Sequence, residues 1–349
     1  MMRTAPNQAA APRGQRSGLP WDDHVWVGDG TGFLDQARQF EAWRGRLVDG
    51  VHVFIGGALF PRWSSITSNG VLAAGGPVDL VYRTSPYKVL MALPLLATES
   101  ASQFAALANG EFDSYHATVA GQLAAFVGQK PIDLRLGWET TRYGAYPWGI
   151  EVGDGAGGWT VPAETRQNYV PGFRRIAAIY KQALPGARVI QNHLRNPLSF
   201  AVRDFFPGND VCDAITVDLY DTGSPDPFVV DEASWATYAG SYDRATGRAT
   251  GAQGYLDYAT DMGVLFGTDE WGPTNAPTVA TNGANNPFFV RKMREWLAAN
   301  GPRVMCAGLF NGVDTHQVWP RVDYLAKASD AYLEAWGGEP DQDARTRKP

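Results

Sequence analysis

Two glutamates lie at the ends of apolar segments that are typical of buried strands. Glu139 follows Ile132–Trp138, and Glu270 follows Val264–Asp269. A carboxylate at the end of a buried strand costs free energy unless it is paired or used. Two facing carboxyl groups can hydrolyse a glycosidic bond, because one protonates the leaving oxygen and the other attacks the anomeric carbon. The pattern predicts Glu139 and Glu270 as a catalytic pair of carboxyl groups.

The residues around each glutamate bear on these roles. Trp138 and Trp271, each next to a glutamate, are candidate sources of the apolar surroundings that separate the two pKa values. Arg135 has a buried-strand position and is expected to orient a catalytic carboxylate through a bidentate pair, with a purely structural ion pair as the alternative. Asp269 should point to the opposite side of the strand from Glu270. It is the second candidate nucleophile if the register is shifted by one residue.

The elements that must position these residues form an alternating series. Eight short apolar runs read as buried parallel strands, because they are continuous rather than alternating. They are Val48–Ile55, Val78–Tyr82, Val89–Leu95, Ile132–Trp138, Ala187–Gln191, Ala214–Leu219, Val264–Thr268 and Val304–Phe310. Glu139 and Glu270 then belong to the fourth and seventh strands.

Helical segments lie between most of these runs. Phe112–Val127, Glu164–Leu184 and Pro287–Ala299 have apolar residues at helical spacing and clear terminators. Alternation of strands and helices at this length predicts an α/β fold, a (β/α)8 TIM barrel in a single domain. No GxGxxG follows the first strand, which argues against dinucleotide binding. We expect a disordered arm at 1–20, the catalytic barrel at 21–336 and a disordered tail at 337–349.

Composition excludes several other classes. The chain of 349 residues has a net charge of −6 and no run of Lys or Arg, so a nucleic-acid partner is not expected. No apolar stretch is long enough for a membrane span, and the first twenty residues lack the apolar core of a signal peptide. Cys212 and Cys306 make no disulfide framework. Localisation and oligomeric state stay open.

Several segments together are similar to a known family. They are 40–46 (FEAWRGR), 135–139 (RLGWE), 146–148 (YPW), 214–221 (AITVDLYD) and 270–272 (EWG). In order and spacing they resemble glycoside hydrolase family 26, mannanase-like retaining glycosidases of the clan A (β/α)8 barrels. The resemblance spans roughly residues 25–335.

This resemblance implies specific roles. Glu139 would be the acid/base, Glu270 the nucleophile, and Tyr220 would donate a hydrogen bond to the nucleophile. The substrate would be a β-1,4-mannan cleaved in endo fashion, and a secreted or periplasmic protein would be typical. The family usually has a polar residue where this chain has Trp138, and many relatives continue with other residues than Thr140-Thr141-Arg142. These differences bear on the sugar, so other β-glycans or a bacterial exopolysaccharide remain alternatives.

Further residues are candidates for substrate binding. Tryptophan faces stack on sugar rings, and polar side chains at strand ends can bind hydroxyl groups. Each candidate has a structural alternative, since a ring can fill the core and a histidine can be a satisfied core residue. Asp218 and Asp221 are expected to serve caps or turns. The binding candidates are Trp138, Trp148, Trp271, Trp319, His52, Asn192, His193 and Asn311.

Two other functions compete with hydrolysis by paired carboxylates. A non-catalytic carbohydrate-binding barrel would have no need for two glutamates at strand ends. A metal-dependent barrel hydrolase would show His-x-His on its first strand and further ligands later, whereas the first predicted strand holds His52 alone. We therefore expect no metal and no cofactor, and a polysaccharide or oligosaccharide as partner.

Overall fold

The structure is a computed structural model. It describes residues 17–28, 32–55, 62–68, 70–127, 131–141, 146–195, 198–221, 228–273, 285–312, 317–320 and 326–338. Within these ranges no helix is long and apolar enough to cross a membrane.

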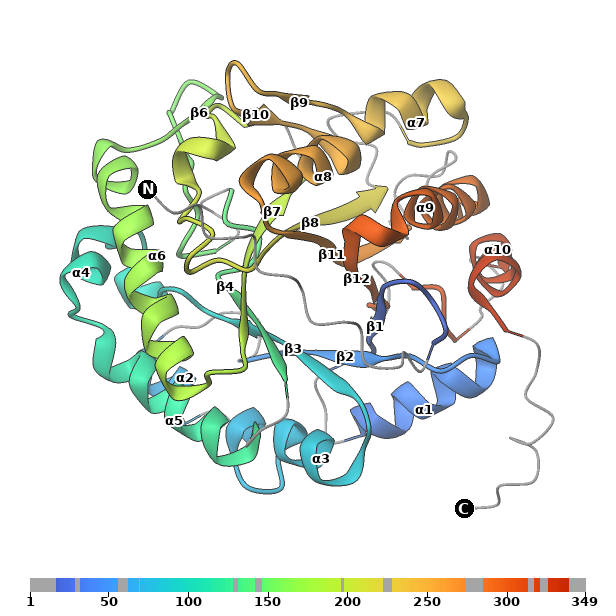
Figure 1. The fold of residues 1–349 in the computed structure, drawn as a ribbon, viewed down its shortest axis with the longest axis horizontal. Helices are drawn as coiled ribbons and strands as arrows, with labels where there is room; N and C mark the ends of the chain where they lie inside the picture. Colours follow the sequence, from blue (N-terminus) through green and yellow to red (C-terminus); the bar gives the residue numbers. More distant parts are fainter. Residues whose placement is uncertain are drawn as a thin grey trace, which may run out of the picture.

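The described residues form a closed barrel of eight parallel strands in the order β1-β12-β11-β8-β7-β4-β3-β2 (Figure 1). The (β/α)8 fold predicted from the sequence is therefore confirmed. The barrel strands are β1 (Asp22–Trp26), β2 (Gly50–Phe54), β3 (Lys88–Leu93), β4 (Ile132–Leu136), β7 (Arg188–Leu194), β8 (Ala214–Asp221), β11 (Leu265–Pro273) and β12 (Val304–Phe310).

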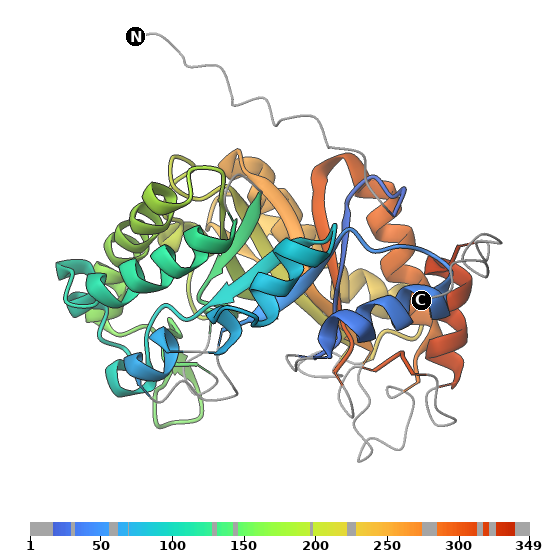
Figure 2. The ribbon, with the colours of Figure 1, turned by 90° about the horizontal axis from the view of Figure 1, so that it is seen from below.

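Helices surround the strands and pack along the outside of the barrel (Figure 2). They are α1 (Phe33–Arg44), α2 (Trp63–Thr67), α3 (Pro77–Thr84), α4 (Phe104–Asn109), α5 (Asp113–Val127), α6 (Ala163–Ala183), α7 (Glu232–Ala239), α8 (Gly251–Met262), α9 (Pro287–Asn300) and α10 (Ala326–Trp336). Single 3-10 turns are η1 (Gly70–Leu72), η2 (Thr98–Ser100), η3 (Val202–Phe205) and η4 (Gly301–Arg303). Two short hairpins pair β5 (Val152–Gly153) with β6 (Trp159–Thr160), and β9 (Tyr242–Asp243) with β10 (Arg248–Ala249).

One predicted strand is wrong and one real strand was missed. The run Val78–Tyr82 lies inside helix α3, where Pro77 starts the helix and Val78, Val81 and Tyr82 are buried at helical spacing. The first barrel strand, β1, has the sequence DDHVW and gives no apolar run. One error adds a strand and the other removes one, so the third to eighth strands keep their predicted places in the barrel order.

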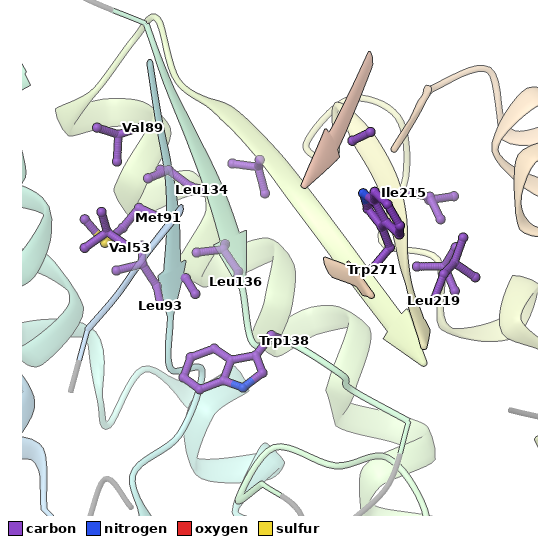
Figure 3. Close-up of a cluster of buried hydrophobic side chains, with 14 of the residues drawn as sticks. Val53, Val89, Met91, Leu93, Leu134, Leu136, Trp138, Ile215, Leu219 and Trp271 are labelled. Atoms are coloured by element: carbon purple, nitrogen blue, oxygen red, sulfur yellow. The ribbon is translucent and has the colours of Figure 1, made fainter. Parts of the chain in front are cut away.

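The outer faces of the strands carry most of the apolar core. Val89, Met91 and Leu93 of β3 alternate with inward residues and join the same cluster as Val81 and Leu123 of the surrounding helices. Figure 3 shows these β3 side chains beside Leu134 and Leu136 of β4, with Trp138 beyond the end of β4.

Salt bridges close the N-terminal end of the barrel interior. Lys88 Nζ lies 2.5 Å from Asp22 Oδ1, while Arg188 lies 2.6 Å from Asp133 and 3.7 Å from Asp22. Strands β7 and β1 are on opposite sides of the barrel, so these groups meet across its interior. A small apolar cluster includes Leu90, Ile190, Ala214 and Cys306. The C-terminal end is left for polar groups that can do chemistry.

Strand β11 contains an irregularity in its register beside Asp269 and Glu270. Its register with β12 runs from Thr268↔Ala307 to Trp271↔Leu309, so three steps on β11 face two steps on β12. This extra residue is a β-bulge, which redirects the side chains of the bulged strand. Strand β11 also continues to Pro273, beyond the predicted end at Thr268, so Glu270 lies within the strand.

The chain ends fall largely outside the described residues. Of the expected arm at 1–20, residues 17–20 are described, and Ser17 Oγ donates to Asp49 Oδ2 at 2.6 Å while Leu19 is buried. Of the expected tail at 337–349, only Gly337 and Gly338 are described.

Candidate active site

Arg135 lies at the centre of the polar groups in the barrel. It comes from β4 and is fully buried. Its Nη1 donates to Asp218 at 3.2 Å, its Nη2 donates to Glu270, and its Nε lies 3.9 Å from Asp269. The guanidinium carbon also lies 5.3 Å from the ring centroid of Phe54. Arg135 therefore contacts a carboxylate, as predicted, but divides its donors between two acids.

Glu270 has a donor on each carboxylate oxygen. Arg135 donates to Oε1 and the hydroxyl of Tyr220 donates to Oε2. The side chain is buried, so these two bonds replace the water that an exposed carboxylate would have. Both contacts that the sequence suggested for this residue are present.

Glu139 lies in a different environment at the end of β4. It is half-buried, and its backbone has a φ of +46°, which is uncommon for a residue with a side chain. Burial and the negative charge of Glu270 raise the pKa of Glu139 to about 7, against opposing effects of Arg135 and a hydrogen bond from Tyr146. This pKa suits a group that donates a proton near neutral pH.

The cluster holds more acids than bases. Arg135 is the common charge neighbour of Asp218, Asp269 and Glu270, and it also acts on Glu139. Burial and neighbouring negative charges raise the pKa of Asp218 well above its usual range, and burial raises the pKa of Asp269. Asp218, Asp269 and Glu139 therefore retain protons to higher pH than exposed carboxyl groups do.

Asp269 does not point away from the site, as the period of two predicted. The bulge in β11 brings both Asp269 and Glu270 to Arg135. Asp269 is almost fully buried and accepts hydrogen bonds from Thr216 at 2.6 Å and from Cys306 at 3.5 Å. Asp218 is likewise no turn residue, because it binds Arg135, whereas Asp221 accepts from the backbone of Val229 at 3.0 Å.

Aromatic residues surround the C-terminal end of the barrel. Trp26, Phe54 and Phe310 each end a barrel strand and are half-buried. Trp26 stacks on Phe310 at 4.2 Å, and Phe54 contacts Trp138 edge-on at 5.3 Å. Tyr220 contacts Phe310 at 6.1 Å. We call these five residues the aromatic rim. Trp26 and Phe310 were not predicted from the sequence. Phe310 is the last residue of a predicted strand, and this signal could have found it, whereas β1 gave no apolar run that would have pointed to Trp26.

Trp148 supports this rim from behind. It is fully buried, its Nε1 donates to the backbone oxygen of Trp138 at 2.6 Å, and its ring stacks on Tyr146 at 5.2 Å. The predicted sugar-stacking role of Trp148 is therefore not supported, whereas Trp138 lies beside the cluster at 6.0 Å from the guanidinium of Arg135.

Two other predicted stacking residues lie away from the cluster. Trp271 is fully buried on the outer face of β11 and stacks on Trp336 of α10 at 4.8 Å. Figure 3 shows its ring beside the outward residues of β8. Trp319 packs edge-on against Phe40 of α1 at 6.1 Å. Their aromatic surface serves the core in both cases.

Of the predicted polar residues, some lie inside the barrel near the charged cluster and others have structural contacts elsewhere. His52 points inward and stacks on Phe54 at 4.4 Å, and burial and Arg135 lower its pKa well below the usual range. His193 faces outward and stacks on Tyr255 of α8 at 5.3 Å. Asn311 is occupied by its own loop, since its Oδ1 accepts from the backbone of Val318 at 2.8 Å. His193 and Asn311 are therefore structural.

Asn192 is also occupied within the protein. Its Oδ1 accepts from the backbone N–H of Glu139 at 2.6 Å, and its Nδ2 donates to Thr216 at 3.0 Å and to Asp218 at 2.8 Å. The predicted closeness to the site is correct, but every polar atom of this amide already has a protein partner.

Comparison with solved structures gives the same architecture. A mannanase from Bacillus subtilis aligns at a TM-score of 0.57 and 13% identity, covering 93% of this chain and 87% of the other. An endo-beta-1,4-mannanase from Cellulomonas fimi gives 0.60 and 15%, covering 93% and 72%. GH26C from Muricauda sp. gives 0.58 and 15%, covering 95% and 91%. The fold is that of these three proteins.

Sequence comparisons give no information on function. No family model matches the chain, and no curated protein matches it. At identities of 13% to 15% the structural likeness shows the fold alone. Function therefore has to be argued from the site.

Proposed function

We propose that this protein is a retaining, endo-acting glycoside hydrolase of family 26 type that cleaves a β-linked polysaccharide. The observation that carries the proposal is the contrast between two neighbouring glutamates. Glu270 accepts hydrogen bonds from Arg135 and Tyr220, while the pKa of Glu139 is raised to about 7. A carboxylate that accepts two hydrogen bonds, beside a carboxyl group that keeps its proton near neutral pH, suits a double displacement.

The proposed mechanism assigns each group a step. Glu139 gives its proton to the glycosidic oxygen as a carboxylate oxygen of Glu270 attacks the anomeric carbon. The leaving sugar departs and a covalent glycosyl–enzyme ester forms. Glu139, now ionised, takes a proton from water, which attacks the anomeric carbon and releases Glu270. Arg135 and Tyr220 orient Glu270 and stabilise its negative charge when the ester bond breaks.

Mannan is the first substrate to consider. Two of the structures with this fold are described as mannanases, one of them an endo-beta-1,4-mannanase. The aromatic rim offers faces on which sugar rings can stack. Trp138 directly precedes Glu139 and lies beside the charged cluster, 6.0 Å from the guanidinium of Arg135. Because the family that the sequence resembles usually has a polar residue at this position, Trp138 favours a different substrate or linkage. Bacterial exopolysaccharides therefore belong in the same test.

The test is hydrolysis of a panel of β-mannans, β-glucans, β-xylans and bacterial exopolysaccharides. Wild type, Glu139→Ala and Glu270→Ala are compared. Glu111→Ala, which removes an exposed carboxyl group outside the site, is the control. We expect wild type and the control to cleave one class of glycan. Glu139→Ala should lose about 10²–10⁴-fold in rate. Glu270→Ala should be inactive until azide is added, and should then form a glycosyl azide of inverted configuration.

Other outcomes would contradict the assignment. Near-normal activity of either glutamate variant would exclude it from its role, and Asp269 would then be tested. Products of inverted anomeric configuration from wild type would exclude the double displacement. Binding of a glycan without cleavage by wild type would leave a carbohydrate-binding barrel as the function.

A further inference from the structure

The acid/base candidate has an uncommon backbone conformation that needs support. Glu139 is one of two non-glycine residues with positive φ among the described residues, and its φ is +46°. Such conformations are held only where the surrounding structure determines them. Gly137, two residues earlier, also has a positive φ of +63°. The turn after β4 therefore carries strain at the residue whose side chain must be aimed.

A chain of hydrogen bonds links the backbone of Glu139 to Asp269 on strand β11. Asp269 Oδ2 accepts from the hydroxyl of Thr216 at 2.6 Å. Thr216 in turn accepts from Asn192 Nδ2 at 3.0 Å, and Asn192 Oδ1 accepts from the N–H of Glu139 at 2.6 Å. These residues come from β11, β8 and β7 and from the end of β4, and the four strands are consecutive neighbours in the barrel. We call this chain the strand relay.

The direction of every bond in the strand relay is fixed. The backbone N–H of Glu139 can only donate, so the Asn192 oxygen must face it, and the amide nitrogen must face Thr216. Thr216 then uses its single hydrogen toward Asp269. The other hydrogen of the amide goes to Asp218 at 2.8 Å. Asn192 is fully buried and has no polar atom left for a sugar hydroxyl.

We propose that Asn192 and Thr216, anchored on Asp269, are positioning residues that hold Glu139 in the left-handed conformation from which it protonates the leaving group. This inference rests on the proposed function. The bulge in β11 bears on both glutamates, since it presents Glu270 for attack and Asp269 as the anchor of the strand relay. The strand relay therefore ties the orientation of the acid/base to the strand that bears the nucleophile.

The inference predicts a loss that depends on the leaving group. Thr216→Val keeps the shape of the side chain and removes the hydroxyl. A misaligned acid slows departure of a sugar alcohol but hardly affects 2,4-dinitrophenolate, which leaves without protonation. For Thr216→Val and Asn192→Ala we expect kcat/KM to fall about 10–100-fold on the natural glycan. On the matching dinitrophenyl glycoside we expect a fall of less than about 3-fold.

Two controls separate positioning from general damage. Thr216→Ser keeps the hydroxyl and should restore most of the activity. Gln191→Ala removes a neighbouring amide of β7 that is equally buried but faces outward, where its Nε2 donates to the backbone of Phe205 at 2.9 Å. It should lower thermal stability without a difference between the two substrates. Equal losses on both substrates for Thr216→Val would overturn the inference.

A crystal structure of Asn192→Ala tests the same inference without activity. Glu139 is expected to leave the left-handed region and its N–H to lose its acceptor. A φ that stays near +46° with an unmoved carboxyl group would overturn the positioning role, whether or not the protein cleaves any glycan. If wild type cleaves nothing but Glu139 moves in this variant, the proposed function fails while the positioning of Glu139 by Asn192 stands.

Discussion

Glu139 and Glu270 have the same side chain but different surroundings. Glu270 is buried with two strong donors, whereas Glu139 is half-buried and faces the negative charge of Glu270. Surroundings that differ in this way suit the proposed roles of Glu139 as acid and Glu270 as nucleophile. Substitution of Tyr146 should change the pKa of Glu139, because the hydrogen bond from Tyr146 is among the effects that lower it.

The pH profile should report this arrangement. Glu139 must be protonated to act as acid, so kcat/KM is expected to fall as pH rises through about 7. Tyr146→Phe removes a hydrogen bond that favours the ionised form, so the alkaline limb should move to higher pH. Tyr242→Phe, on the β9–β10 hairpin, is the control and should leave the limb in place. A limb that moves to lower pH in Tyr146→Phe would contradict the assignment.

Stability should depend on the same carboxyl group. In the folded protein Glu139 holds its proton up to about pH 7, whereas its ordinary value is 4.5. The folded state binds more protons than the unfolded state between these values, so this group lowers stability as pH rises from about 4.5 to 7. Glu139→Gln should therefore be more stable than wild type by about 1–2 kcal/mol at about pH 8, after allowance for partial exposure. The two should unfold alike at about pH 4.

Urea unfolding at both pH values measures this difference. Glu111→Gln, at an exposed position, should change stability by less than about 0.5 kcal/mol at either pH. A Glu139→Gln variant that is less stable than wild type at the higher pH would show that the ionised carboxylate is stabilised, contrary to its raised pKa.

At the level of elements, the bulge in β11 depends on a glycine in the next strand. A Cβ on Gly308 of β12 would lie 2.1 Å from the backbone oxygen of Asp269. Gly308→Ala must therefore displace β11 where it presents Asp269 and Glu270. We expect kcat/KM to fall by at least about 10-fold and stability by about 1–3 kcal/mol, as in other overpacked sites. Kinetics and thermal unfolding measure the two effects.

Gly121→Ala provides a matched control. Gly121 lies in α5, and no atom lies within 4 Å of the place that the added methyl group would take. The same substitution should there raise stability by about 0.5–1 kcal/mol and leave activity unchanged. Full activity of Gly308→Ala would show that the bulge does not position the nucleophile strand.

The sequence was sufficient for the barrel, because continuous apolar strands follow local rules. It also placed Glu139 and Glu270 in one polar cluster, and their catalytic roles stay a prediction. It was insufficient for β1, whose charged and polar residues are buried by partners far away in sequence. Asp23, for example, pairs with Arg44 at 2.6 Å. It also failed at Val78–Tyr82, where a short apolar run fits a strand or a buried helix equally well and tertiary packing decided for the helix.

Within the site, the error at Asp269 has a specific cause. The period of two predicts which face a strand residue occupies, but a bulge breaks that period, and a single sequence does not reveal a bulge. The bulge moved Asp269 to Arg135, whereas Trp271 lies on the outer face, as the period of two gives for the residue after an inward Glu270. The partners of Asn192 are likewise set by three other strands, so its role could not be read from its own segment.

At the level of the whole molecule, the first and last elements close the barrel together. Arg44 of α1 lies 2.6 Å from Asp23 of β1 and donates to the hydroxyl of Tyr332 in α10 at 3.0 Å. Trp21 contacts Trp336 edge-on at 6.3 Å. The arginine is buried, so this junction excludes water from a charged pair.

Removal of that arginine should therefore weaken the whole fold. Arg44→Met leaves Asp23 buried without its cation, and we expect a loss of about 3–5 kcal/mol in the free energy of unfolding near neutral pH. The loss should shrink toward about pH 4, because burial raises the pKa of Asp23 and removal of Arg44 removes the charge that opposes this. Arg44→Met combined with Asp23→Asn should recover part of the stability. Urea unfolding at both pH values measures this, and a loss that grows toward acid pH would contradict the role of the pair.

The surplus of acids around Arg135 has a consequence for ligands. A buried region with one guanidinium and several carboxyl groups has an electrostatic potential that stabilises positive charge. A sugar ring gains such charge at its anomeric carbon on the way to the transition state. The field that opposes ionisation of Glu139 thus favours the cationic ring over the neutral one. Sugar mimics with a protonated nitrogen are the inhibitors that this field should select.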